Sequence, residues 1–128
     1  NSNSEFAGVK NLSIKDIINE PFILTEHGQG YRRVFDKELA KKSMEISPIL
    51  EIGRTDMITT LVSNSDMLSF LPDFVTKDLI EAGKLCYLNV QDMNIEIWKQ
   101  LIYHKNKWVS PAMRKVIHYC LDVSEKLL

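Results

Sequence analysis

The strongest constraint on the fold is a short apolar segment that leads through a glycine-rich loop into an amphipathic helix. Residues 21–24 read Pro-Phe-Ile-Leu, and Gly28 and Gly30 interrupt any regular continuation. From Tyr31 onward the apolar positions follow helical spacing: Val34, Phe35 and Leu39. The opposite face of this helix is polar: Arg32, Arg33, Asp36, Lys37, Lys41 and Lys42. We therefore expect a strand followed by a helix.

The same strand-then-helix pattern recurs twice further along the chain. Residues 49–52 form a second strand, and four apolar residues then mark one helical face: Met57, Ile58, Leu61 and Val62. Residues 67–71 form a third strand, and Pro72 opens a helix that ends at Gly83, the expected position of a left-handed C-cap. Short connections between strands and helices favour a parallel sheet covered by helices, because parallel strands need crossover connections.

The last part of the chain is predicted to hold two more strands and a helix. The strands are residues 84–90 and the longer segment 95–104. Ser110 and Pro111 start the helix as N-cap and first helical residue. Five residues of this helix form the stripe expected to be buried: Met113, Val116, Ile117, Cys120 and Leu121. The predicted fold class is α/β, in the order βαβαβαββα.

Charge and hydropathy exclude several function classes. The 128 residues include 16 basic and 17 acidic side chains, so a net charge of −1 gives no bulk attraction to DNA. The apolar runs are far shorter than the roughly 18 residues that cross a bilayer, so no membrane partner is expected. The length suits one domain with a core of its own.

Residues that could carry chemistry are sparse. His27, His104 and His118 lie far apart without the spacing of metal ligands, and no nucleophile elbow, phosphate-binding loop or zinc-protease motif is present. Cys86 and Cys120 are isolated among apolar neighbours, which predicts reduced, buried thiols and a cytoplasmic protein. We expect a protein that is not an enzyme and uses neither a metal nor a cofactor.

Two loops that follow strands are the best candidates for binding. A glycine-rich turn between a strand and a helix directs free backbone N–H groups beyond the carboxyl end of the strand, where they can hold an anion. Residues 25–30 fit this description, and fit a plain tight connection equally well. Residues 53–56 follow the second strand in the same way, and Arg54 either forks onto a carboxylate or faces solvent. In an open α/β sheet both loops line the crevice at the strand ends.

Six short motifs follow one another in a characteristic order. They are Pro21-Phe22-Ile23-Leu24, Gly28-Gln29-Gly30-Tyr31-Arg32-Arg33, Leu50-Glu51-Ile52-Gly53, Met57-Ile58-Thr59-Thr60-Leu61-Val62, Phe70-Leu71-Pro72 and Ser110-Pro111-Ala112. In order and spacing, from about Leu12 to Leu121, they resemble the effector-binding region of LysR-type transcriptional regulators. The resemblance implies a type II periplasmic-binding-protein fold, built of three-layer, Rossmann-like subdomains with a small effector in the cleft between them.

The resemblance also implies how the chain is divided. Residues 7–128 correspond to a fragment of the effector-binding domain, in which residues 12–94 are the second subdomain. Residues 95–128 are the strand and helix that return toward the first subdomain, which lies outside this chain together with an N-terminal helix-turn-helix. Residues 1–6 have the composition of a cloning-vector remnant. DNA is expected to be contacted only through the helix-turn-helix, and the full-length protein is expected to be a homodimer or homotetramer.

Carried over residue by residue, the resemblance assigns effector-facing roles to seven residues: Thr25, Gly28, Gln29, Gly30, Gly53, Arg54 and Thr55. The effector implied is a small, anionic metabolite such as an organic acid or an amino acid. Two positions depart from the family pattern: Arg54 replaces a small hydroxyl residue, and Ser65-Asp66-Met67 replaces a G-x-G sequence before the third strand. A solute-binding protein of the same fold is the alternative function.

Overall fold

Two short parallel strands lie at the centre of the first of two units into which the chain divides. The computed structural model describes residues 1–98 and 100–125, and its units are Asn1–Ile97 and Trp98–Leu128. The first unit contains α1 (Ile14–Ile17), β1 (Ile23–Leu24), α2 (Gly30–Lys41), β2 (Leu50–Glu51), α3 (Thr55–Ser63) and α4 (Asp73–Glu81). The second unit contains α5 (Pro111–Glu125).

β1 is the middle of three parallel segments. It pairs with β2 on one edge, with Ile23 opposite Leu50 and Leu24 opposite Glu51. On its other edge a single parallel bridge joins Phe22 to Leu68. The Leu68 N–H donates to the Pro21 carbonyl and the Ile23 N–H donates to the Leu68 carbonyl, both over 2.9 Å. The parallel arrangement predicted from the short crossover connections is therefore confirmed.

The predicted order βαβαβαββα is wrong in its number of strands. The third strand, 67–71, is reduced to the bridge at Leu68, and the fourth, 84–90, to a bridge between Leu12 and Val90. No strand occurs within the described part of 95–104, namely residues 95–98 and 100–104. A segment of alternating apolar residues forms a strand only where a neighbouring segment pairs with its backbone N–H and C=O groups. Residues 67–71 and 84–90 each meet such a neighbour at a single position.

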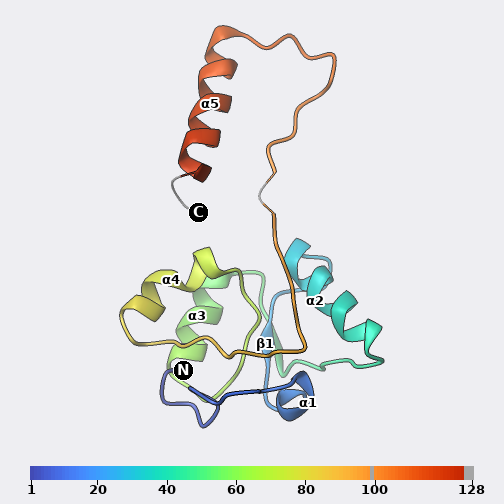
Figure 1. Cartoon of the computed structure of the whole chain (residues 1–128), viewed down its shortest axis with the longest axis vertical. Coiled ribbons are helices and arrows are strands. Elements are labelled where there is room, and N and C mark those ends of the chain that lie inside the picture. The colour runs from blue at the N-terminus through green and yellow to red at the C-terminus, as the bar shows by residue number, and fades with distance from the viewer. Residues whose placement is uncertain (99, 126–128) are drawn as a thin grey trace. The chain divides into compact units, whose positions relative to one another are not determined.

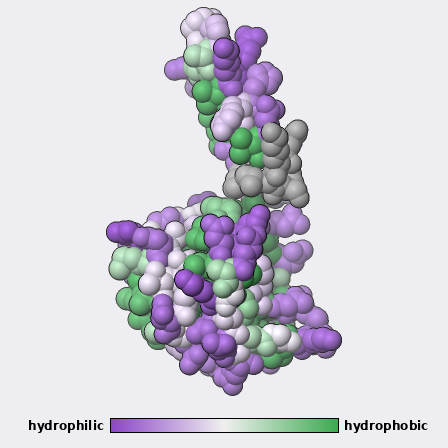
Figure 2. All heavy atoms as spheres, turned by 90° about the vertical axis from the view of Figure 1, so that its left-hand side faces the viewer, coloured by the Kyte–Doolittle hydropathy of each residue, from purple (hydrophilic) through white to green (hydrophobic). Residues whose placement is uncertain are grey.

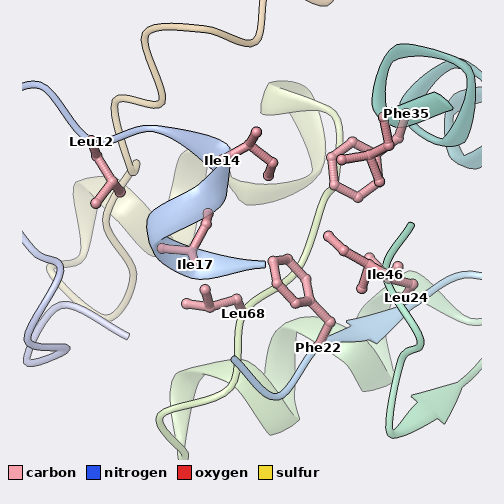
Figure 3. Packing of buried hydrophobic residues seen from close by; sticks show 9 residues of the cluster. Leu12, Ile14, Ile17, Phe22, Leu24, Phe35, Ile46 and Leu68 are labelled. Atoms are coloured by element: carbon pink, nitrogen blue, oxygen red, sulfur yellow. The ribbon is translucent and has the colours of Figure 1, made fainter. Parts of the chain in front are cut away.

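Helices cover both faces of β1. Phe22 and Leu24 point into a core cluster shared with α1 and α2, whereas Ile23 points into a second cluster that includes Ile58 of α3. This alternation is the ordinary period of a strand and produces three layers (Figure 1). In the first cluster, the side chains of Ile14 and Ile17 from α1 converge with that of Phe22 (Figure 3).

The helices form broadly where their apolar spacing predicts them. In α2, Phe35 and Leu39 are buried as expected, but Arg32, predicted to lie on the polar face, is buried as well. α4 ends as predicted, because Gly83 has a φ of +69° and its N–H donates to the Ile80 carbonyl.

Residues 1–6, set apart from the fold in the sequence analysis, contact the first unit. The Ser2 hydroxyl donates to the Gly83 carbonyl over 2.7 Å, and the Phe6 side chain packs against the first core cluster. Cys86, half-buried instead of buried, donates from its thiol to the Asn1 carbonyl over 3.3 Å. These residues therefore take part in packing, whatever their origin.

The second unit contains a capped helix whose apolar stripe is not buried. Ser110 is the N-cap that the sequence predicts, since its hydroxyl accepts the Met113 N–H over 3.2 Å. The stripe expected to be buried is half-exposed at Met113 and Ile117 and exposed at Val116, Cys120 and Leu121. The described residues of this unit form no second helix or strand against which α5 could bury it.

Hydrophilic side chains are interspersed with hydrophobic patches on the side of the first unit that Figure 2 shows. Among the described residues, no helix has the length and apolar content needed to cross a bilayer.

Truncating Leu39 tests the core. We expect Leu39→Ala to lower the free energy of unfolding by about 2–5 kcal/mol, because it removes a fully buried side chain between α2 and β1. Met57→Ala is the matched control: Met57 is also helical but exposed, so the change should be within about 0.5 kcal/mol. Urea denaturation of the two variants measures the difference, and equal losses would contradict the core described here.

Candidate functional site

The two candidate loops begin side by side at the carboxyl ends of β1 and β2. Leu24 pairs with Glu51 at the end of the strands, and the Ile52 N–H donates to the Leu24 carbonyl over 3.0 Å. Thr25 and Gly53 then start the connections to α2 and α3. The sheet therefore brings the seven predicted residues to one edge of the first unit, as expected for loops after neighbouring parallel strands.

The first loop is a tight turn that ends in an uncapped helix. The Gln29 N–H donates to the Glu26 carbonyl over 3.3 Å, and Gly28 adopts a φ of +91°, which a residue with a side chain rarely takes up. Gln29 is the N-cap of α2, but its side chain makes no capping hydrogen bond. The first N–H groups of α2 therefore lack the side-chain acceptor that commonly satisfies them.

Thr25 is the most buried of the candidate residues. Its exposed fraction is 1%, and its Oγ1 atom has no hydrogen-bond partner. A buried hydroxyl is normally paired, because an unpaired one has lost its water without compensation. The orphan hydroxyl lies between the end of β1 and the turn, so it is a polar atom available to a partner if the loop moves.

The second loop also leads into a helix whose N-cap side chain makes no capping hydrogen bond. Arg54 is this N-cap, and Thr55 is the first helical residue. The Glu26 carboxylate of the first loop lies over Gly53, with its Oε1 atom 3.2 Å from the position that an added Cβ would take. Gly53 thus allows a side chain of one loop to lie against the backbone of the other.

Arg32 links the first loop to the end of β2. Its guanidinium is 2% exposed and donates from Nη1 to the Thr25 carbonyl over 2.7 Å and to Glu51 Oε1 over 3.1 Å. Its Nε donates to Asp36 Oδ1 over 2.8 Å. One planar group therefore links the first residue of loop one, the last residue of β2 and the next turn of α2. This use of several donors in a fixed plane is specific to arginine.

Arg54 does not present a free guanidinium. It is exposed and forms a forked hydrogen bond to the carboxylate of Asp56, from Nε to Oδ1 over 3.1 Å and from Nη2 to Oδ2. The hydrogen bond from Arg54 lowers the pKa of the Asp56 carboxyl group, and the same bond raises the pKa of Arg54. A ligand carboxylate would have to compete with Asp56 for this group.

The arrangement can hold an anion by its backbone but also carries negative charge. The N-terminus of α2 has no side-chain cap and offers N–H groups and the positive end of a helix dipole, whereas at α3 the Asp56 carboxylate accepts the first N–H groups. Glu26 and Asp56 place carboxylates beside them. Within residues 1–98 and 100–125, no three His, Cys, Asp or Glu side chains are grouped so as to hold a metal ion.

A cavity of the first unit lies away from both loops. It has a volume of about 370 Å³ and is lined mainly by apolar side chains, including those of residues 67–71 and 85–90. None of the seven candidate residues lines it. The two loops therefore form an exposed edge and not an enclosed pocket.

Five residues outside the predicted set make contacts that link the parts of the candidate site. They are Glu26, His27, Arg32, Asp36 and Glu51. Arg32 was placed on the solvent face of its helix because it is charged, and the only sequence signal for its pairing is the Arg32–Asp36 spacing of four residues. The link to Glu51 depends on strand pairing, which a one-dimensional pattern does not fix.

Adding a methyl group at Gly53 tests the contact between the loops. We expect Gly53→Ala to displace the Glu26 side chain and to lower the free energy of unfolding by less than about 1 kcal/mol, because the displaced group is the end of a flexible chain. In a protein that already carries Glu26→Ala, adding Gly53→Ala should cause no further loss of unfolding free energy. An equal cost of the glycine change in both backgrounds would show that the two residues do not touch.

Removing the Arg54 guanidinium tests the second pairing. The Arg54 hydrogen bond lowers the Asp56 pKa, so this bond contributes slightly to stability above the ordinary aspartate pKa. The contribution is lost as the pH falls through the lowered pKa of Asp56. In Arg54→Ala the Asp56 pKa should rise toward the ordinary value of an aspartate side chain. A carboxyl-detected NMR titration measures this, and an unchanged Asp56 pKa would contradict the pairing.

Comparisons with known proteins identify the family of this chain. The family model described as "LysR substrate binding domain" matches residues 2–125. Over 106 residues, 83% of this chain and 36% of the relative, the chain is 32% identical to the HTH-type transcriptional regulator YwqM of Bacillus subtilis. It is 27% identical to YeiE of Escherichia coli over 111 residues (85% and 37%) and 24% identical to the activator CmpR of Synechocystis over 110 residues (86% and 36%). The chain spans little more than a third of the length of these relatives. It belongs to the LysR substrate-binding domain family.

Proposed function

We propose that this chain is the effector-binding part of a LysR-type transcriptional regulator and that its two loops bind a small, anionic metabolite. The names of the relatives support the regulatory role, since YwqM, YeiE and CmpR are all named as transcriptional regulators or activators. The observation that carries the binding role is the buried and unpaired Thr25 hydroxyl beside the loop to the uncapped N-terminus of α2, at the edge where the loop to α3 also begins.

The binding energy would come mainly from the backbone. Each helix N-terminus favours an anion by about 0.3–1 kcal/mol at an exposed site, and by more when the ligand is partly buried. A ligand that touches both loops would gain at the start of α2, and at the start of α3 only where it displaces the Asp56 carboxylate. The Thr25 hydroxyl would give it one further hydrogen bond once the loop admits it.

The effector class follows from the charges around the loops. A carboxylate suits the N–H groups, and the carboxylates of Glu26 and Asp56 suit a cationic group on the same molecule. An organic acid would bind only the N–H groups, whereas an amino acid would bind the N–H groups through its carboxylate and the two carboxylates through its ammonium group. Amino acids and small organic acids are therefore the compounds to screen.

The effector would control transcription by shifting a conformational equilibrium. Residues 12–94 would form one wall of a cleft, and residues 95–128 would complete the subdomain that forms the other wall. An effector that bridges the walls would favour one relative orientation of the subdomains. It would shift the equilibrium between the two orientations by the difference between its binding free energies to them. In a cytoplasmic homodimer or homotetramer, that orientation would set the spacing of the helix-turn-helix heads on DNA.

A thermal-shift screen of the full-length regulator tests this function. A compound that binds only the folded protein at about 100 times its dissociation constant stabilises it by about 2.7 kcal/mol, which raises the melting temperature measurably. The effector should lose affinity in Thr25→Val, which removes the buried hydroxyl, whereas the exposed Thr60→Val on α3 is the matched control and should bind normally. If no organic acid or amino acid raises the melting temperature, and Thr25→Val leaves transcription unchanged, the proposal is wrong.

A further inference from the structure

The cavity of the first unit that lies away from the two loops is lined by residues of both core clusters. Its volume is about 370 Å³, and all its lining residues belong to Asn1–Ile97. Ile14 and Phe22 of the first cluster line it, and so do Val62 and Leu85 of the second. The cavity therefore lies where the two clusters meet.

The position of this cavity follows from the two segments that were predicted as strands and did not become strands. Residues 67–71 and 85–90 line it, and each segment is joined to a neighbour by one bridge, at Leu68 and at Val90. Strands that pair along their whole length lie about 4.8 Å apart, and side chains fill the space beside them. Pairing at a single position leaves part of that space open.

The walls of the cavity suit an uncharged molecule. They are mainly apolar, and none of the described residues that form them carries a charged side chain. Two of the polar lining residues already use their hydrogen-bond donors: the Thr59 hydroxyl donates to the Asp56 carbonyl over 2.9 Å, and the Cys86 thiol donates to the Asn1 carbonyl over 3.3 Å. An ion in such a space would lose its hydration without a compensating charge. The cavity therefore disfavours the anions proposed for the two loops.

The Ser69 hydroxyl gives the cavity one polar group that can hold a ligand. Its Oγ atom is buried and makes no hydrogen bond, although buried hydroxyls are normally paired. A water molecule needs two to four polar partners to be held in a protein interior, and the residues on either side of Ser69, Leu68 and Phe70, line the cavity with apolar side chains. A ligand with a hydroxyl group would supply the partner directly.

We propose that this cavity binds an uncharged, mainly apolar molecule of about two fused rings, whose hydroxyl group forms a hydrogen bond with Ser69. An apolar cavity of about 150 Å³ holds one benzene ring, so about 370 Å³ has room for two rings. Apolar walls with few polar groups are typical of ligand sites. Ser4, Tyr87 and Asn89 are exposed residues of the lining, so a ligand can enter from solvent on their side. The site is separate from the proposed anion site and does not depend on it.

Three molecules that share two fused rings test which chemical class the cavity accepts. They are 2-naphthol, which carries a hydroxyl group, naphthalene, which has no polar group, and 2-naphthoate, which is an anion. Each is titrated into the 128-residue chain, and methyl NMR signals are followed. With 2-naphthol and with naphthalene, we expect the signals of Val62 and Leu68, which line the cavity, to shift. Leu39 is buried outside the lining, so its signal should stay in place, and 2-naphthoate should shift none of the three.

Removing the Ser69 hydroxyl tests the hydrogen bond. In Ser69→Ala the affinity for 2-naphthol should fall by about two- to ten-fold, the range that one hydrogen bond supplies, whereas the affinity for naphthalene should not fall. The chain should still fold, because the Ser69 hydroxyl has no partner to lose. Ser63→Ala is the matched control and should bind both molecules normally. Ser63 is also half-buried, but its hydroxyl donates to the Thr59 carbonyl over 2.7 Å, and it does not line the cavity.

Three results would overturn the proposal. The first is that 2-naphthol leaves the Val62 and Leu68 signals unmoved, and the second is that 2-naphthoate shifts them as strongly as 2-naphthol does. The third is an affinity for 2-naphthol that Ser69→Ala leaves unchanged, or lowers no more than Ser63→Ala does.

Discussion

The geometry of the candidate site depends on the hydrogen bonds that the buried guanidinium of Arg32 donates. This guanidinium is buried between α2 and the ends of both strands and reaches a carbonyl of the first loop and a carboxylate of β2 at once. Because β1 and β2 are only two residues long, their pairing alone gives little control over where the two loops begin. The planar, always charged group supplies that control.

Burying a charge in this way is costly unless its donors find acceptors, and here Nε donates to Asp36 while Nη1 donates to the Thr25 carbonyl and to Glu51. Asp36 and Glu51 stay partly hydrated on their outer sides, which reduces the cost of bringing them together. The same outer sides are open to His27. The cluster is thus buried at Arg32 and partly hydrated on its outer side, where the first loop lies.

Sequence reasoning predicted the parts of this molecule that depend on local patterns. The helices α2, α3 and α4, the cap at Ser110 and the left-handed Gly83 all follow from short-range spacing and backbone preference. The predicted strands at 84–90 and 95–104 failed because a strand also needs a neighbour, and an alternating pattern does not say whether one is present. Arg32 was misplaced for a related reason: its charge predicts solvent exposure, and only the pairing of β1 with β2 brings the carboxylate of Glu51 to it.

The candidate site was predictable in its backbone but not in its side chains. The glycines at 28, 30 and 53 mark both turns, and parallel strands necessarily bring such turns together. Glu26 over Gly53, and Asp56 on Arg54, are contacts of flexible groups that only the folded structure reveals. These contacts change the chemistry expected of the site, because they add negative charge to a site that was predicted to be purely positive.

Replacing Arg32 by lysine tests most directly whether one buried guanidinium sets both loops. The change keeps the charge but loses the planar fork, and Arg33→Lys on the exposed side of the same helix is the control. In Arg32→Lys we expect the amide NMR signals of Gly28 and Gly53 to shift together and the free energy of unfolding to fall by about 1–3 kcal/mol. Unmoved signals at Gly53, or equal effects in Arg33→Lys, would contradict the central role of Arg32.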